Sequence, residues 1–301
     1  MKWMLLCLAL GAAGIAAAKV TLKDFPTRWT QGEAYRIYTP EGCPPGCVAI
    51  AGAAIVQYYK VEQGPALTSN SCRVNGEPRT LTTASETYNW DNPGDDDYAR
   101  LAYNLGVRLG MSYETTSSSV AFAKLKDVLD DYGLASTYVS CVSGEPTAED
   151  YKRLIQAPLR LGWPVALTIG GEPTSHAVIA TGFNPTTGET QIFNGYGRQD
   201  WNTLPSIYVH GVGTYSKIYG LLIVRPPCEA GKIWVAVTGT VTAEGNLPSV
   251  TLTCNGQTAT ATPGDDGAYA LALPVASGET LTLTCGGRST TLAFTTPDET
   301  P

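Results

Sequence analysis

The sequence predicts an α+β fold followed by a small all-β module. In residues 19 to 227, segments with apolar residues at helical spacing come first and strand-like apolar segments follow. After residue 227, helix-forming residues become rare and Thr, Val and Gly dominate. Helices followed by strands are typical of α+β folds, whereas alternating βα units give parallel sheets. We therefore expect a signal segment (1–18), a main domain (19–227) and a β-sandwich module (228–301).

The first 18 residues, MKWMLLCLALGAAGIAAA, have the pattern of a secretory signal. Lys2 precedes an apolar run, and Ala16 to Ala18 form an A-x-A cleavage pattern before Lys19. The run is too short to span a bilayer and is not repeated later in the chain. The sequence therefore predicts an exported protein without a membrane span.

Four helices are expected in the main domain. The stretch GCVAIAGAAIVQYY (46–59) is rich in alanine and follows two prolines and a glycine, so a buried helix starts near Cys47. Acidic starts or capping patterns with apolar residues at helical spacing predict three more. Their residues are 95–111, 117–133 and 147–162, the last with a Thr147–Asp150 capping pattern.

Strands are expected where short apolar runs lie between turn residues. In the main domain these are 164–171, 176–183, 190–197, 206–211 and 219–226. In the module they are 233–243, 249–263, 268–275 and 279–294. A module of about 70 residues is small enough to benefit from a disulfide, and a Cys254–Cys285 pair is favoured because both cysteines lie in expected strands.

Eight cysteines are present, and Cys7 is expected to leave with the signal. In an exported protein most cysteines pair, so the remaining seven predict at least one free thiol. Cys43 is expected to bond to Cys72 or Cys141. A Cys43–Cys47 bridge is the alternative, and it would block the Cys47 thiol.

The net charge of −7, with no basic cluster, argues against nucleic acid or anionic membranes as partners. Only two histidines are present and no Cys/His cluster has metal-ligand spacing, so neither a metal nor an organic cofactor is expected. The run GDDG (264–267) could supply oxygen ligands to calcium, but it has the composition of a turn.

Cys47 is expected at the N-terminus of a helix, a position that changes the pKa of a thiol. At the N-terminus of a helix, unpaired N–H groups and the helix dipole favour an anion and can lower a thiol pKa. The alternative is a small core residue or half of a disulfide. His176 follows Cys47 by 129 residues and Asn194 follows it by 147, a spacing similar to that of papain-type thiol peptidases. His210 has no candidate partner near it in the sequence.

Several segments resemble the streptopain-like cysteine peptidases, in the same order, over about 200 residues. GCVAIAGAAIVQYY is similar to the nucleophile helix of that family, and SHAVIATGF (175–183) to the strand that carries its histidine. WTQGEAYRIYTP (29–40), YNWDNP (88–93) and LGVRLGMSY (105–113) resemble three further family segments. The module is similar to carboxypeptidase-regulatory β-sandwiches.

The resemblance implies a papain-like, two-lobed cysteine endopeptidase that cleaves polypeptides. Cys47 would be the nucleophile, His176 the general base and acid, Gln31 an oxyanion donor, and Asn194 the residue that orients His176. The sequence departs from the family after Asn194, where Gly195 and Tyr196 replace a tryptophan. Tyr196 or Trp201 is expected to take its place.

A second departure is the short segment of residues 19–28 before Trp29, where related proteases carry a long pro-region. Latency is therefore absent or depends on another route, such as a separate protein inhibitor. Two other functions stay open: a related thiol amidase or leader peptidase, and an inactive surface protein whose module binds a glycan or a protein.

Overall fold

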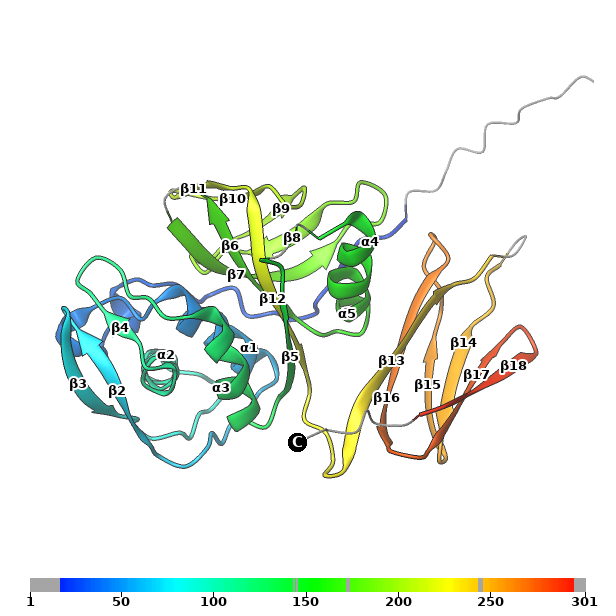
Figure 1. The fold of residues 1–301 in the computed structure, drawn as a ribbon, viewed down its shortest axis with the longest axis horizontal. Coiled ribbons are helices and arrows are strands. Elements are labelled where there is room, and N and C mark those ends of the chain that lie inside the picture. Colours follow the sequence, from blue (N-terminus) through cyan, green and yellow to red (C-terminus); the bar gives the residue numbers. More distant parts are fainter. Residues whose placement is uncertain (1–16, 143, 145, 172–173, 243–245, 295–301) are drawn as a thin grey trace, which may run out of the picture.

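A computed structural model gives the fold, and it describes residues 17–142, 144, 146–171, 174–242 and 246–294. Figure 1 shows a helical part, a larger sheet beside it and a C-terminal group of strands. The larger sheet has seven strands. The α+β class is confirmed. Residues 1–16, which hold most of the expected signal, lie outside the described residues. No helix among the described residues is long and apolar enough to cross a membrane.

Helix α1 (Cys47–Tyr58) is the centre of the helical part. All residues from Val48 to Val56 are buried. Apart from Gly52, each of them is an alanine, valine or isoleucine, so the helix is apolar on all sides. α2 (Asp95–Leu109) and α3 (Leu125–Asp131) pack against it. Three short 3₁₀ helices complete this part: Glu33–Tyr35, Pro40–Gly42 and Phe122–Lys124.

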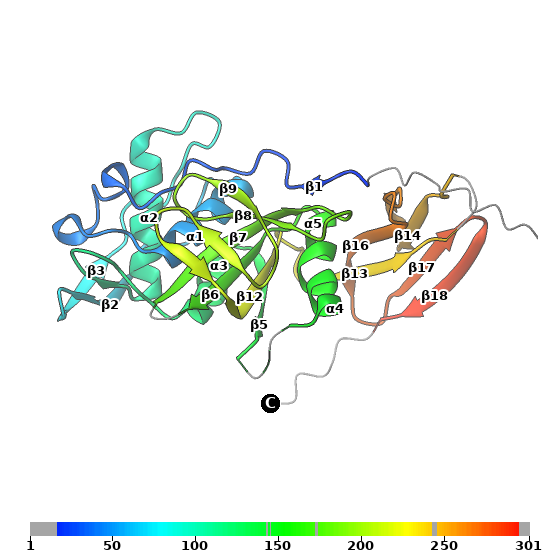
Figure 2. The same ribbon diagram turned by 90° about the horizontal axis from the view of Figure 1, so that it is seen from above.

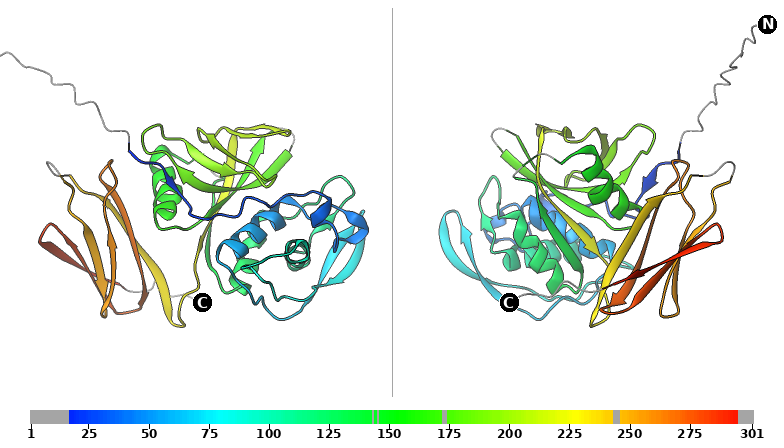
Figure 3. Two further views of the ribbon diagram at one scale, coloured as in Figure 1. Left: turned by 180° about the vertical axis from the view of Figure 1, so that it is seen from behind. Right: turned by 45° about the vertical axis from the view of Figure 1, so that its right-hand side comes forward.

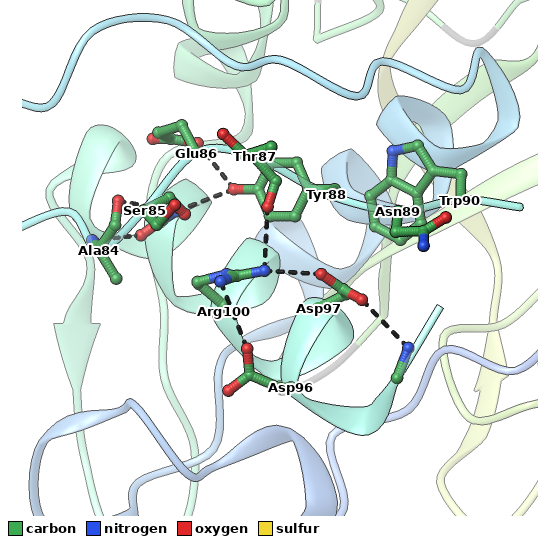
Figure 4. Close-up of polar contacts among 12 residues, drawn as sticks. Ala84, Ser85, Glu86, Thr87, Tyr88, Asn89, Trp90, Asp96, Asp97 and Arg100 are labelled. Atoms are coloured by element: carbon green, nitrogen blue, oxygen red, sulfur yellow. Dashed lines mark hydrogen bonds and ion pairs between the residues drawn. The ribbon is translucent and has the colours of Figure 1, made fainter. Parts of the chain in front are cut away.

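α2 is tied to the segment before it through Arg100, as Figure 4 shows. Arg100 pairs with Asp96 and Asp97 in the first turn and donates to the Thr87 carbonyl. Asp97 also accepts the N–H of Gly94, which caps the helix. Beside α2 lies a small sheet of β2 (Ser69–Val74), β3 (Glu77–Thr82) and β4 (Ser112–Tyr113).

The seven-stranded sheet is antiparallel and runs in the order β5-β12-β6-β7-β8-β9, with β1 added to β7. Its strands are β1 (Val20–Thr21), β5 (Ala135–Ser140), β6 (Val165–Gly171), β7 (Thr174–Phe183), β8 (Thr190–Phe193), β9 (Gln199–Asn202) and β12 (Lys217–Arg225). A hairpin of β10 (Ile207–Val209) and β11 (Gly213–Tyr215) lies between β9 and β12 in the chain. α1 packs against β7, so one core joins helices and sheet.

The N-terminal segment enters the fold against the C-terminal end of β7, an inner strand of this sheet. Val20 lies opposite Phe183, and the N–H of Leu22 donates to the main-chain carbonyl of Thr181. Figure 3 shows the segment passing from the sheet to the helical part. Leu22 and Phe25 are buried on the way, so these residues are a built-in part of the fold.

A helical segment between β5 and β6 in the chain packs between the seven-stranded sheet and the C-terminal strands. It consists of α4 (Ala148–Tyr151), a π-helical turn (Lys152–Gln156) and α5 (Ala157–Arg160). The Thr147–Asp150 capping box is confirmed, because each side chain accepts the other residue's backbone N–H. α5 contacts β1 and β7 on one side and β16 on the other, and Figure 2 shows it between the two groups of strands.

The C-terminal region forms strands only, within the residues that the structure describes. β13 (Lys232–Thr240) pairs with β16 (Ala268–Ala276), and β15 (Gln257–Ala261), β14 (Val250–Cys254), β17 (Thr280–Cys285) and β18 (Arg288–Ala293) form a second sheet. The two sheets share a small core of valine and leucine side chains. Arg160 on α5 pairs with Asp266, and Trp163 packs edge-on against Trp234 at 5.8 Å.

The cysteine pairing expected from the sequence is wrong. All seven described cysteines are free, so Cys43 is bonded neither to Cys72 nor to Cys141, and Cys47 is not bridged to Cys43. The Cys254–Cys285 pair fails because of strand register: Cys285 lies opposite Val250, four residues from Cys254. Four residues of strand span about 13 Å, twice the Cα separation that a disulfide allows.

Candidate active site

Cys47 is the first residue of α1, and the chain reaches it through a glycine that no other residue could replace without strain. Gly46 has φ of 89°, and a Cβ there would lie 3.0 Å from Met111 and from the Ser118 carbonyl. The N–H groups of the first helical turn have no partner within the helix. The thiol therefore lies beside free backbone donors, as the sequence predicts.

His176 is the third residue of β7, and its side chain is buried. Its Nε2 lies 2.8 Å from the main-chain oxygen of Asn194. A carbonyl oxygen can only accept, so Nε2 carries the proton and donates it. In the neutral ring Nδ1 then keeps its lone pair, which is the form that a general base requires.

Asn194 contacts His176, but through an atom that the sequence did not indicate. Its main-chain carbonyl makes the contact, whereas its side-chain Oδ1 accepts the N–H of Tyr196 at 2.8 Å. The Nδ2 atom is buried and has no partner in the described structure. The side chain therefore shapes the turn that follows β8, and this turn positions both the carbonyl and Tyr196.

Two tyrosine rings lie nearly parallel to the His176 imidazole. The centroid of Tyr196 is 5.4 Å away with an interplanar angle of 13°, and that of Tyr215 is 6.1 Å away at 22°. Of the two residues expected to replace the tryptophan of the resembling family, Tyr196 is the one that stacks on His176. Trp201, the other candidate, lies on β9 against Lys19.

A cleft of about 800 Å³ brings Gln31, Cys47 and His176 together. Its walls come from two parts of the fold. One wall belongs to the helical part: residues 30–32, 36, 44, 47, 48 and 116–122. The other belongs to the sheet and its hairpin: residues 168, 174–177, 196, 212 and 215. His210 does not line this cleft; it packs against Tyr208 in the β10–β11 hairpin.

Gln31 points across the cleft toward the histidine side. Its Nε2 donates to the Tyr196 hydroxyl at 3.2 Å. Tyr196 therefore connects two of the sequence-predicted residues, because its ring stacks on His176 and its hydroxyl holds the amide of Gln31. The sequence offered Tyr196 only as a substitute aromatic and gave no signal for the hydroxyl contact.

Burial is the largest influence on the pKa values of Cys47 and His176. It raises the pKa of the Cys47 thiol, although the backbone N–H groups of Ala177, Val48 and Cys47 itself oppose this. Burial also lowers the pKa of His176, against the opposing effect of its bond to Asn194. The lowered thiol pKa that the sequence predicted for a helix N-terminus is therefore wrong for the free protein, because desolvation outweighs the backbone donors.

The acidic limb of the pH profile of kcat/KM is expected below pH 6.5, the ordinary pKa of the imidazole. The free base is lost only when the pH falls through the lowered pKa of His176. Initial rates on an uncharged peptide, measured between about pH 4 and 9, test this. An acidic limb above pH 6.5 would contradict the neutral, buried imidazole.

Replacing Tyr196 tests its two contacts separately. Tyr196→Phe removes only the hydroxyl that holds Gln31 and should lower kcat/KM about 2- to 10-fold. Tyr196→Ala also removes the stacked ring and should lower it about 10- to 100-fold. The alanine variant also exposes His176 to water, so its acidic limb should move to higher pH. Equal effects of both changes, with no movement of the limb, would show that Tyr196 only fills space.

Among the residues that the structure describes, no group of three or more His, Cys, Asp or Glu side chains could hold a metal ion.

Comparison with known proteins gives one family. No curated protein sequence matches the chain. The family model of the Peptidase C10 family matches residues 29–199, more than half of the chain, and this range contains Gln31, Cys47, His176 and Asn194. Peptidase C10, the streptopain family, consists of cysteine peptidases. The chain therefore belongs to the Peptidase C10 family and is a cysteine-type hydrolase of peptide bonds.

Proposed function

We propose that the protein is an exported endopeptidase in which Cys47 and His176 cleave polypeptides through an acyl-enzyme. The observation that carries this is the cleft itself, because it unites a thiol at a helix N-terminus with an imidazole of fixed tautomer. The two walls of the cleft support a papain-like, two-lobed layout for residues 19–227. The two C-terminal sheets with their shared core support a β-sandwich module in residues 228–301.

The first half of the reaction forms a thioester. As the Cys47 sulfur attacks the peptide carbonyl carbon, its proton passes to Nδ1 of His176. The developing oxyanion accepts hydrogen bonds from the Gln31 amide and the Cys47 N–H. The C–N bond then breaks, and the leaving amine takes the proton from His176.

The second half reverses these roles. Water attacks the thioester carbonyl and gives a proton to His176. The carboxylic acid leaves when the C–S bond breaks, and the sulfur recovers its proton. His176 thus needs an unprotonated Nδ1 at the start of each half, which the Nε2–H···O contact with Asn194 supplies.

Active-site labelling tests the proposal. The thiol-protease inhibitor E-64 should modify Cys47 rapidly, and His176→Ala should abolish the rapid labelling. Cys141, another partly buried thiol, provides the matched control: Cys141→Ser should leave labelling unchanged. The wild-type protein should also cleave an unfolded protein mixture at internal sites.

The other functions give different results. Labelling that is no faster than that of free cysteine, and unaffected by His176→Ala, would indicate a binding protein on an inactive peptidase scaffold. Rapid labelling with cleavage of cell-wall peptides or leader peptides, but not of unfolded proteins, would indicate a thiol amidase or leader peptidase. Export itself is tested by N-terminal sequencing of secreted protein, which should begin at Lys19.

A further inference from the structure

Arg36 is a charged residue that lines the cleft. Of the described residues that line the cleft, only Arg36 carries a permanent charge, while the others have apolar, hydroxylic, amide, thiol or imidazole side chains. The protein as a whole is acidic, with a net charge of −7. A cation in this one position is therefore not part of a general basic surface.

Arg36 has no carboxylate partner within the part of the chain that the structure describes. The ion pairs there do not include it. Glu41, an acidic residue near it in sequence, is bound instead to Arg79 at 2.8 Å and to Asn75. An unpaired cation that lines a cleft is available to an anionic ligand.

The guanidinium is also held in place. Its Nε donates to the main-chain oxygen of Gln31 at 3.1 Å, and the side chain is partly buried. This contact uses one donor and leaves the two terminal nitrogens, whose fork geometry suits a carboxylate. Because Gln31 is the proposed oxyanion donor, the free donors lie close to the bond that would be cleaved.

We propose that Arg36 binds a carboxylate of the substrate near the scissile bond. The carboxylate belongs to an Asp or Glu side chain, or to the C-terminus of the peptide, in the part of the substrate that lies next to Gln31. This inference rests on the proposed peptidase function. It makes the enzyme selective for acidic sites, or for bonds near a free C-terminus.

Paired peptides distinguish the two sources of the carboxylate. In the first pair, both ends are blocked and one internal residue, scanned through the positions around the cleavage site, is Glu or Gln. In the second pair, the sequence is neutral and the C-terminus is free or amidated. We expect a ratio of kcat/KM of about 5 to 10 in favour of the carboxylate in at least one pair.

Three variants then assign the preference to Arg36. In Arg36→Gln the ratio should fall to about one, and in Arg36→Glu it should fall below one because like charges repel. Arg73→Gln, which removes an exposed arginine of β2 away from the cleft, is the matched control and should keep the wild-type ratio. Replacing Arg36 also removes its contact with Gln31 and can slow the hydrolysis of every peptide. Such a general loss cancels in the ratio of kcat/KM between the two peptides of a pair.

Two results would overturn the inference: a wild-type ratio of one in both pairs, or a ratio that Arg36→Gln does not change. Binding of the same peptides to Cys47→Ala, measured by fluorescence anisotropy, separates this inference from the proposed function. If no peptide is hydrolysed but the variant still binds the carboxylate form more tightly, and Arg36→Gln removes that difference, then Arg36 has its proposed role and the peptidase proposal fails.

Discussion

Replacing His176 with alanine is expected to lower kcat/KM for peptide hydrolysis by about 10³- to 10⁵-fold. Burial raises the pKa of the partly exposed Cys47 thiol, so without a base the thiol stays protonated at neutral pH and cannot attack a carbonyl. Cys47→Ala should reduce the rate to the same residual level. Steady-state hydrolysis of one fluorogenic peptide by each purified variant provides the measurement.

The double variant makes this prediction sharper. Residues that act as one unit have non-additive effects, so Cys47→Ala/His176→Ala should be no slower than either single variant. Added imidazole should restore part of the activity of His176→Ala, because Tyr196 and Tyr215 still offer flat rings beside the vacated space. It should not rescue Cys47→Ala. Losses that add up across the two sites would contradict a shared role in catalysis.

Replacing Arg108 with methionine is expected to lower the free energy of unfolding by about 3–5 kcal/mol. Arg108 and Glu86 form a buried ion pair at 2.9 Å, and their side chains are 6% and 2% exposed. Methionine is close to arginine in length but leaves the Glu86 carboxylate buried without its cation. Urea unfolding followed by tryptophan fluorescence measures the change.

The stabilising effect of this pair reaches further than its two residues. Glu86 also accepts hydrogen bonds from the hydroxyls of Tyr88 and Tyr132, both at 2.7 Å. The network thus joins the segment before α2 to α2 itself and to Tyr132, the residue that follows α3, and both helices pack against α1.

The variant Arg108→Met/Glu86→Gln is the control for this second prediction. A neutral amide no longer needs a cation, and its oxygen can still accept from the tyrosines, so the double variant should recover part of the lost stability. A single-variant cost below about 1 kcal/mol, the value of exposed pairs, would show that water reaches Glu86.

Local pattern was sufficient for the helix that carries the nucleophile. Alanines after a proline–glycine stretch predict α1 within a residue of its start, and the strand that carries His176 follows from its apolar run. The third expected helix was predicted from residue 117, but the helical turns begin only at Phe122. Residues 116–121 instead line the cleft, where serine and threonine favour non-helical backbone.

What the sequence could not supply depends on contacts between distant segments. The spacing of Cys47 and Asn194 does not say whether a side chain or a carbonyl faces the imidazole. Burial raises the pKa of the Cys47 thiol, which is opposite to the change expected from the helix end alone. Strand register, set by the pairing of β14 with β17, excluded the favoured cysteine pair.

The unbridged cysteines have a practical consequence for handling the protein. Because the described fold contains no sulfur–sulfur bond, a reductant has nothing structural to break. Air oxidation of Cys47 to sulfenic acid would inactivate the enzyme, and dithiothreitol would reverse that step without destabilising the fold. Activity that disappears in air and returns on reduction would then report the redox state of a single sulfur atom.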